Sequence, residues 1–317
     1  MIFYNLKKNL TECPPPDLPS AVALGIFDGV HIGHSALLSE TVRIRDRLTE
    51  SGERAVAMVW SFVEQPKNFL GDGHFAPVLT PADEKLRLFA EAGIDYAALE
   101  NFSNVENFSP ERFVRQVLVR DLHCRAGICG FNFRFGAGGK GNAEHLASLL
   151  GRFGAGTSIV PAVTVDGSIV SSSRIRLLIE NGFTEEAAKM LGRPFSINFP
   201  VVYGNQLGRT IGIPTINQDF PEGHIIPKNG IYACRVDVGG DVFTGVTNVG
   251  CRPTVDGSGR INSETHIIDY DGILYGKRIR VSFYRRLRDE IRFSSVVELK
   301  AQILKDISSA KSFFAQT

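Results

Sequence analysis

The chain lacks most of the features that mark membrane, secreted and nucleic-acid-binding proteins. Its 317 residues carry 35 Lys and Arg against 34 Asp and Glu, and a formal charge of +1 provides no field to hold nucleic acid or an anionic membrane. No apolar run approaches the roughly 18 residues that a membrane-spanning helix needs, and residues 1–10 lack the pattern of a secretory signal. Five scattered cysteines without a CxxC pair argue against a disulfide framework or a zinc site. We therefore expect a cytoplasmic protein that binds neither nucleic acid nor a membrane; an oligomer is allowed but not indicated.

The hydrophobic period changes about two thirds of the way along the chain, which predicts two domains, 1–183 and 184–317. In the first, short apolar runs alternate with helical patterns, and this alternation predicts an α/β fold with a parallel sheet. The expected strands are 21–27, 55–62, 96–99, 126–130 and 158–163, and the expected helices are 34–49, 81–92, 110–122, 143–153, 172–181 and 185–191.

The second domain has short β-branched and aromatic runs separated by glycine-rich turns. This pattern predicts a small antiparallel barrel or sandwich. The expected strands are 197–203, 231–238, 242–249, 264–270 and 277–284. A terminal helix over 296–307 follows, with an apolar face formed by Val297, Leu299, Ile303, Leu304 and Ile307.

The sequence GIFDGVHIGH at 25–34 lies between the first predicted strand and the first predicted helix. Ligands of open α/β sheets bind at that place, where a helix N-terminus faces the crevice. Gly25 and Gly29 allow the backbone to approach a phosphate, and His31 and His34 would offer donors from one helix face. A glycine turn with two surface histidines is the alternative, but the position of the motif favours a nucleotide site.

Two further segments of the first domain carry weaker signals. Ser172 lies in a run of hydroxyl side chains suited to a helix N-cap, and the guanidinium of Arg176 could form bidentate hydrogen bonds to phosphates. An ordinary cap with solvated arginines is the alternative explanation of both residues. The run GFNFRFG at 130–136 places the amide of Asn132 among three phenylalanines. It suits either a pocket for a flat aromatic ring or a core strand, and the sequence leaves both open.

The loop at 204–217, GNQLGRTIGIPTIN, contains three glycines and Arg209. Such a loop can fold its amides around phosphates, although it is not a Walker A sequence. Thr215 and Asn217 would point the same way from an extended segment and offer two neutral oxygens, which suits Mg²⁺ beside ATP phosphates. Glu264 could accept a proton from an attacking alcohol, or it could be a solvent-facing strand glutamate.

The pairing of GxFDGxHxGH with a downstream SSxxIR resembles the adenylyltransferase half of bacterial bifunctional riboflavin kinase/FAD synthetases, within the HxGH nucleotidyltransferase group. The resemblance continues through LT at 79–80, EK at 84–85, 108–113 and 130–136. It implies a Rossmann-like parallel sheet of the nucleotidyltransferase type. The implied nucleotide-binding residues are Gly25, Phe27, Asp28, Gly29, His31, His34, Ser172 and Arg176, with His31, His34 and Arg176 catalytic, and the implied flavin-pocket residues are Phe62, Pro66 and Asn132.

The second half is similar to the riboflavin kinase module of the same family, so the resemblance covers almost the whole chain. The matching segments are GxxxGRxxGxPTxN at 204–217, GIYA at 230–233, NVGCRPT at 248–254, ETH at 264–266 and LRDE at 287–290. The resemblance implies a β-barrel with a terminal helix. The loop from Gly204 through Gly208 to Arg209 would close over ATP, Thr215 and Asn217 would ligate Mg²⁺, and Glu264 would be the general base toward the riboflavin 5′-hydroxyl.

The expected function is therefore flavin cofactor synthesis: ATP-dependent phosphorylation of riboflavin to FMN, then adenylylation of FMN to FAD with release of pyrophosphate. At one position Gln65, before Pro66, replaces a histidine that is usual in the family, and glutamine cannot carry a proton or charge there. This departure motivates an alternative, a riboflavin kinase with a degenerate or altered adenylyltransferase half. A non-catalytic flavin-binding regulator would lack the magnesium and base positions, and a nicotinamide oxidoreductase would have GxGxxG after the first strand.

Overall fold

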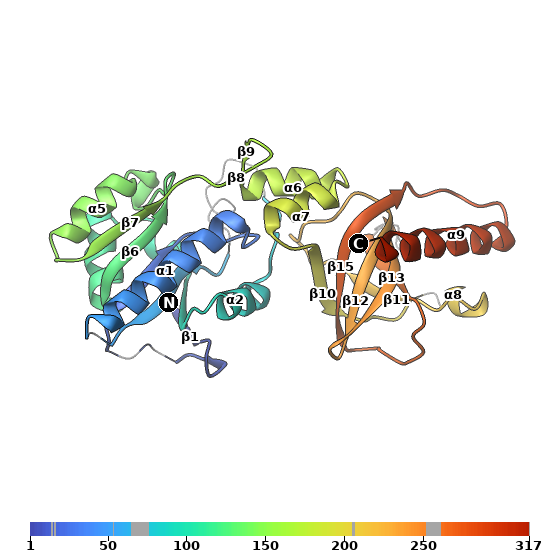
Figure 1. The fold of residues 1–317 in the computed structure, drawn as a ribbon, viewed down its shortest axis with the longest axis horizontal. Coiled ribbons are helices and arrows are strands. Elements are labelled where there is room, and N and C mark those ends of the chain that lie inside the picture. Colours follow the sequence, from blue (N-terminus) through green and yellow to red (C-terminus); the bar gives the residue numbers. More distant parts are fainter. Residues whose placement is uncertain are drawn as a thin grey trace. The chain divides into compact units, whose positions relative to one another are not determined.

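The computed structural model describes residues 1–13, 15, 17–52, 54–64, 76–204, 207–251 and 261–316. The chain divides into two compact units, Met1–Ser172 and Ser173–Thr317 (Figure 1). Each unit is built on a sheet of its own. Among the described helices, none combines the length and the apolar character needed to cross a membrane.

The first unit contains a seven-stranded sheet in the order β2-β1-β5-β4-β3-β6-β7. Strands β5, β4, β3, β6 and β7 run parallel, and β1 pairs antiparallel with β5 and β2 at one edge. The strands are β1 (Ile2–Asn5), β2 (Leu10–Thr11), β3 (Ser20–Leu24), β4 (Val56–Phe62), β5 (Tyr96–Glu100), β6 (Cys124–Gly130) and β7 (Gly156–Val160), with a separate hairpin of β8 (Thr164–Val165) and β9 (Ser168–Ile169).

Helices cover both faces of this sheet, which explains why β3 is apolar throughout. Val22 and Leu24 pack in one core cluster and Ala21 and Ala23 in another, because alternate residues of a strand point to opposite faces. Helix α1 runs across β3, β4 and β6 (Figure 1). The helices are α1 (Ile32–Glu50), α2 (Ala82–Glu91), α3 (Phe102–Val105), α4 (Pro110–Arg112), η2 (Phe113–Asp121), η3 (Ala137–Gly139) and α5 (Ala143–Gly151).

The strand order gives the first unit a switch point at β3. The chain proceeds from β3 to β4 and β5 on one side, then returns to β6 and β7 on the other. Ligands of open parallel sheets bind outside the carboxyl ends of the strands at such a point. The loop that leaves β3 is the one that carries GIFDGVHIGH.

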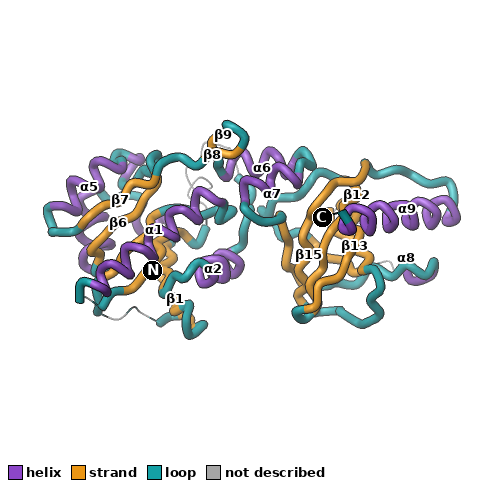
Figure 2. The backbone as a smooth tube through the Cα atoms, viewed as in Figure 1, coloured by secondary structure: helices purple, strands orange, loops and turns teal. Residues whose placement is uncertain are grey.

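The second unit is an antiparallel six-stranded sheet in the order β10-β15-β12-β13-β14-β11. Figure 2 shows the strands in orange and the helices in purple. The strands are β10 (Phe195–Pro200), β11 (Ile216–Asp219), β12 (Gly230–Val238), β13 (Asp241–Cys251), β14 (Ile261–Ile267) and β15 (Arg278–Arg288). The helices are α6 (Ser172–Glu180), which begins at the boundary of the units, α7 (Thr184–Leu191), α8 (Leu207–Thr210) and α9 (Val296–Ala315).

The two edge strands of this sheet meet, so that the sheet nearly closes into a barrel. Val202, just after β10, forms a bridge with Asn217 of β11. The buried side chain of Gln218 donates to the carbonyl oxygens of Phe199 at 2.7 Å and Ile279 at 2.8 Å. A single amide therefore joins β11 to both β10 and β15.

The predicted fold class is confirmed in both units. The predicted helix at 110–122 is instead the short α4 followed by the π-helix η2, where the N–H of Leu122 donates to the carbonyl of Val117. The predicted apolar face of the terminal helix is wrong for Val297 and Leu304, which are 78% and 52% exposed. Helix α9 extends to Ala315 and packs through its C-terminal half around Ala310, so the predicted window was centred too early.

The bonds of Gln218 generate a stability prediction. Gln218→Leu keeps the bulk of the side chain but removes the two buried hydrogen bonds that its amide donates, at about 0.5–1.5 kcal/mol for each bond. We expect the free energy of unfolding in urea to fall by about 1–3 kcal/mol, and amide hydrogens of β11 to exchange faster. Gln316→Leu, at an exposed position after α9, is the matched control and should change neither measurement. Unchanged exchange in β11 would contradict the role of Gln218.

Candidate functional sites

The loop that leaves β3 has a strained backbone. Phe27, Gly29 and Val30 have positive φ angles of 54°, 87° and 38°. Such angles cost a non-glycine residue about 1–3 kcal/mol, and they are rarest for β-branched residues such as Val30. Strain of this kind persists only where surrounding contacts impose it, and it concentrates at functional sites.

Asp28 supplies the main contacts that hold this loop. Its carboxylate is 3% exposed and accepts hydrogen bonds from the backbone N–H groups of Leu79 at 3.0 Å and Thr80 at 3.2 Å. The hydroxyl of Ser172 donates to the carbonyl of Asp28 at 2.8 Å. Hydrogen bonds to a charged acceptor are among the stronger ones in proteins, so these contacts can offset the strain.

His31 and His34 form one compact unit at the start of α1. His31 is the N-cap, and its Nδ1 accepts a hydrogen bond from the N–H of His34 at 3.3 Å. The two rings stack with centroids 3.7 Å apart, and Phe27 packs on the ring of His34 at 5.1 Å. An accepting Nδ1 places the ring proton of His31 on Nε2, which is then a donor. Together with the helix dipole, this donor makes the helix start suitable for an anion.

Lys85 is a buried cation near this loop that the sequence reasoning did not assign to the site. It is 6% exposed on α2, and its Nζ donates to the carbonyl of Phe62 at 3.1 Å. Burial lowers the pKa of Lys85, and the negative charge of Asp28 opposes that shift. The available signal was a lysine within an amphipathic helix at a position that faces the core.

The residues predicted for the flavin pocket differ in how far they are buried. Phe62 is half-buried, with its ring edge-on to Trp60 at 4.8 Å. Asn132 is exposed in the loop after β6, whereas Phe135, three residues later, is 7% exposed. Pro66, and Gln65 with it, lie outside the described residues.

Ser172 and Arg176, which the sequence also predicts for the nucleotide site, lie on α6. Ser172 is the last residue of the first unit, and its hydroxyl is used by the loop as described. Arg176 belongs to the second unit and is 9% exposed. Gly25 follows β3 directly, where its N–H donates to the carbonyl of Trp60.

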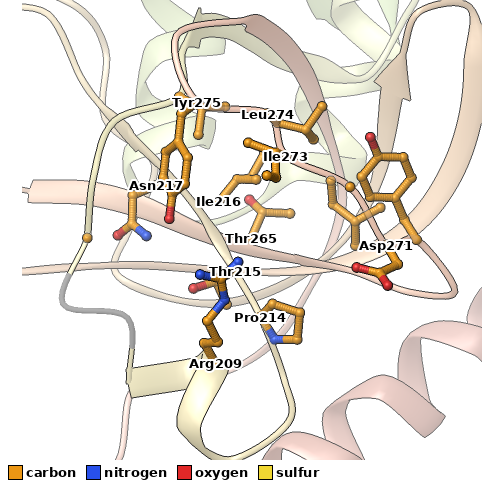
Figure 3. A pocket seen from close by; sticks show the side chains of 15 residues that line it. Arg209, Pro214, Thr215, Ile216, Asn217, Thr265, Asp271, Ile273, Leu274 and Tyr275 are labelled. Carbon is orange, nitrogen blue, oxygen red and sulfur yellow. The ribbon is translucent and has the colours of Figure 1, made fainter.

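The barrel contains two cavities that share Thr215 in their walls. The first has a volume of about 310 Å³ and is polar on the side shown in Figure 3, where Arg209 extends from α8 toward Thr215. Asn217, Asp271 and Tyr275 also line this cavity. The second has a volume of about 250 Å³ and contains Glu264 in a largely apolar wall. Its apolar residues are Ile211, Ile213, Ile231, Val246, Ile291, Phe293, Leu299 and Ile303, and the same cavity is also lined by Asn248, His266, Arg288, Glu290 and Asp306.

The strand register brings distant residues of the barrel into one row. Asn217 pairs with Glu264, Glu264 pairs with Asn248, and Asn248 pairs with Ile231. Directly opposed residues on neighbouring strands share a face and have Cβ atoms about 4.5–5.5 Å apart. The row therefore runs from the polar cavity, which Asn217 lines, into the apolar cavity, which the other three line.

Gly204 and Gly208 permit close approaches in the loop before β11. A Cβ on Gly204 would collide with the side-chain amide of Asn217, and one on Gly208 would collide with the carbonyl of Ile213. Both glycines are therefore required by the path of the chain beside the polar cavity. Asn205 and Gln206, between them, lie outside the described residues.

The side-chain oxygens of Thr215 and Asn217 are suitable ligands for Mg²⁺. Asn217 is 5% exposed, and its Oδ1 accepts one hydrogen bond from the amide of Asn262 at 3.1 Å, which leaves a second lone pair. The described residues contain no cluster of three or more His, Cys, Asp or Glu that could hold a metal. A cation here would rely on neutral protein oxygens together with substrate phosphates and water, which is the usual arrangement for Mg²⁺.

Comparisons with known proteins agree with this division of the chain. The family model for FAD synthetase matches residues 14–174, and the model for riboflavin kinase matches residues 191–314. The bifunctional riboflavin kinase/FMN adenylyltransferase of Bacillus subtilis (strain 168) is 33% identical over 301 residues, with 93% of each chain covered. The protein of the same name from Escherichia coli (strain K12) is 35% identical over 313 residues, with 98% of this chain and 96% of that protein covered.

A solved structure from Streptococcus pneumoniae, described as a macrolide-efflux protein, aligns with a TM-score of 0.84 and 29% identity over 97% of both chains. The full-length match to the enzymes and the order of the two modules agree with the parallel-sheet unit followed by the barrel. This chain belongs to the family of bifunctional riboflavin kinase/FMN adenylyltransferases, which make FMN from riboflavin and FAD from FMN.

Proposed function

We propose that the polar cavity of the barrel binds Mg²⁺·ATP and that the apolar cavity binds riboflavin. Thr215 lies in the wall of both cavities, and Glu264 lies in the apolar one; this shared wall is the observation that carries the proposal. Arg209 provides positive charge for phosphates on one side, and aliphatic side chains provide a surface for an isoalloxazine ring on the other. The kinase would comprise residues 184–317 and the adenylyltransferase residues 1–183.

Glu264 would act as the general base of the kinase. It would take the proton of the riboflavin 5′-hydroxyl as that oxygen bonds to the γ-phosphorus, and the bond from the γ-phosphorus to the β-phosphate oxygen would break to release ADP. Thr215 and Asn217 would hold Mg²⁺, which when bound supplies neutralisation of phosphate charge. The half-buried setting of Glu264 supports this role, because the riboflavin hydroxyl would reach it from the apolar side.

The loop of the first unit would bind the ATP used for adenylylation. The phosphate of FMN would attack the α-phosphorus as the bond to pyrophosphate breaks, so the protein need only position the reactants and stabilise charge. His31 at the start of α1, with His34 stacked on it, provides that stabilisation, while Arg176 and Ser172 are the further phosphate candidates. Phe62, Pro66 and Asn132 would contact the flavin.

Loss of the proposed base should separate the two activities. With riboflavin, ATP and Mg²⁺, we expect the unaltered enzyme to yield FMN and FAD, and Glu264→Gln to lower FMN formation by about 10²–10⁴-fold. With FMN as substrate, the same variant should still form FAD. Chromatography of the products measures both steps.

Two outcomes would contradict these assignments. Retained FMN formation by Glu264→Gln would remove Glu264 as the base. FMN without FAD from the unaltered enzyme would favour a kinase whose adenylyltransferase half is altered, the alternative raised by Gln65.

The histidines should matter for FAD alone. Combined His31→Ala and His34→Ala removes the donors at the start of α1, and we expect pyrophosphate release from FMN and ATP to fall by at least about 10²-fold. FMN formation from riboflavin should remain, which serves as the internal control for folding of the barrel. An unchanged pyrophosphate yield would show that the adenylylation site lies elsewhere.

A further inference from the structure

Asn248 on β13 carries a buried polar atom that the described residues leave unsatisfied. Its side-chain Oδ1 is inaccessible to solvent and has no hydrogen-bond partner within the part of the chain that the structure describes. A buried acceptor without a partner costs about 1–3 kcal/mol, so nearly all such atoms in folded proteins are paired. Asn248 lines the apolar cavity. A rotation of its side-chain amide would turn this oxygen to the cavity surface, where a bound molecule could supply the missing donor.

The neighbours of Asn248 restrict what that molecule can place there. Asn248 is directly opposite Glu264 on β14 and Ile231 on β12, and all three line the same cavity. Glu264 is therefore on one side of Asn248 and the apolar Ile231 on the other. The Cβ spacing of about 4.5–5.5 Å between opposed residues is short enough for neighbouring hydroxyls of one polyol to reach both Asn248 and Glu264.

We propose that Asn248 accepts a hydrogen bond from a hydroxyl of the riboflavin ribityl chain near its 5′ end, and that it thereby selects flavins with an intact polyol chain. The inference rests on the proposed binding of riboflavin in the apolar cavity. The ring system would occupy the aliphatic region and the 5′-hydroxyl would meet Glu264, so the remaining ribityl hydroxyls lie between these two ends. A neutral amide suits them because it adds no charge beside the base.

We expect Asn248 to affect how strongly the enzyme prefers riboflavin over analogues that lack one ribityl hydroxyl, and not the phosphoryl transfer step itself. A site that pairs a buried polar group with a substrate hydroxyl rejects an analogue that lacks this hydroxyl, because the protein group is then left unpaired. Without Asn248, the same hydroxyl gains nothing in the cavity. Riboflavin should then be phosphorylated no better than the analogue.

The experiment compares riboflavin with its 2′-, 3′- and 4′-deoxy analogues as substrates of the intact enzyme, with FMN-type products separated by chromatography. We expect one analogue to have a kcat/KM about tenfold or more below that of riboflavin. In Asn248→Ala this ratio should approach one, because kcat/KM falls for riboflavin and not for that analogue. Asn198→Ala, at a half-buried position of β10 that lines neither cavity, should retain the ratio of the unaltered enzyme.

The outcomes separate this inference from the proposed function. The inference is overturned if the unaltered enzyme phosphorylates riboflavin but Asn248→Ala keeps the same kcat/KM ratios between riboflavin and its analogues. Equal loss of activity toward all four substrates would have the same meaning, because Asn248 would then not recognise a ribityl hydroxyl. If Asn248→Ala does not fold, Asn248→Ser provides the same comparison with a shorter polar group, and unchanged ratios again overturn the inference. An active Glu264→Gln would instead overturn Glu264 as the base, and it would leave the comparison of substrate ratios at Asn248 as it stands.

Discussion

The register of the antiparallel barrel is the constraint on which the proposed kinase site depends. Asn217, Asn248 and Glu264 come from three different strands, and none is close to another in the sequence. Backbone pairing alone places them in one row, because opposed residues of neighbouring strands share a face. A slip of one residue in β14 would turn Glu264 to the other face and place Thr265 or Ser263 in the wall of the apolar cavity instead. The bonds from Gln218 to two other strands fix β11, so they also fix the first member of the row.

The two sites proposed for a triphosphate are built by different means. The parallel sheet offers a helix N-terminus, approached through a loop whose strained residues are held by the buried carboxylate of Asp28. The barrel offers a glycine-containing loop, an arginine and neutral oxygens, with no helix of comparable length beside the cavity in the described residues. Under the proposed assignment, the first arrangement would stabilise charge where an α-phosphate reacts and would need no base. The second would include Glu264, because an alcohol must lose its proton to become a phosphate ester.

Local sequence patterns were sufficient for what depends on local structure. The alternation of apolar runs and helical patterns predicted the parallel sheet, since β3 and β4 are buried on both faces. Glycines and histidines at 25–34 could be placed at a strand end for the same reason. Strand β11 was not predicted, because Pro214 and the glycines before it resemble a loop and the strand has only four residues. The pairing of Asn248 with Glu264 and the burial of Lys85 depend on tertiary register and packing, which no periodicity in one segment reports.

The terminal helix also shows that periodicity within one segment does not determine tertiary packing. Val297 and Leu304 have the spacing of a buried face, yet they are exposed, because packing is decided by the strands that α9 meets. Its half-buried Leu299 and Ile303 instead complete the apolar cavity. Apolar residue type and spacing therefore did not identify the side of the helix that the barrel covers.

The cap that His31 makes on α1 restricts how this imidazole can take part in chemistry. Its Nδ1 already holds the amide of His34, so a proton arriving at that nitrogen would displace the amide and loosen the first turn of the helix. The ring can lend the hydrogen of its other nitrogen to a phosphate oxygen, but it is unsuited to pass protons through from one nitrogen to the other. If the proposed adenylylation site is correct, this histidine serves FAD formation as a fixed hydrogen-bond donor and not as a proton relay.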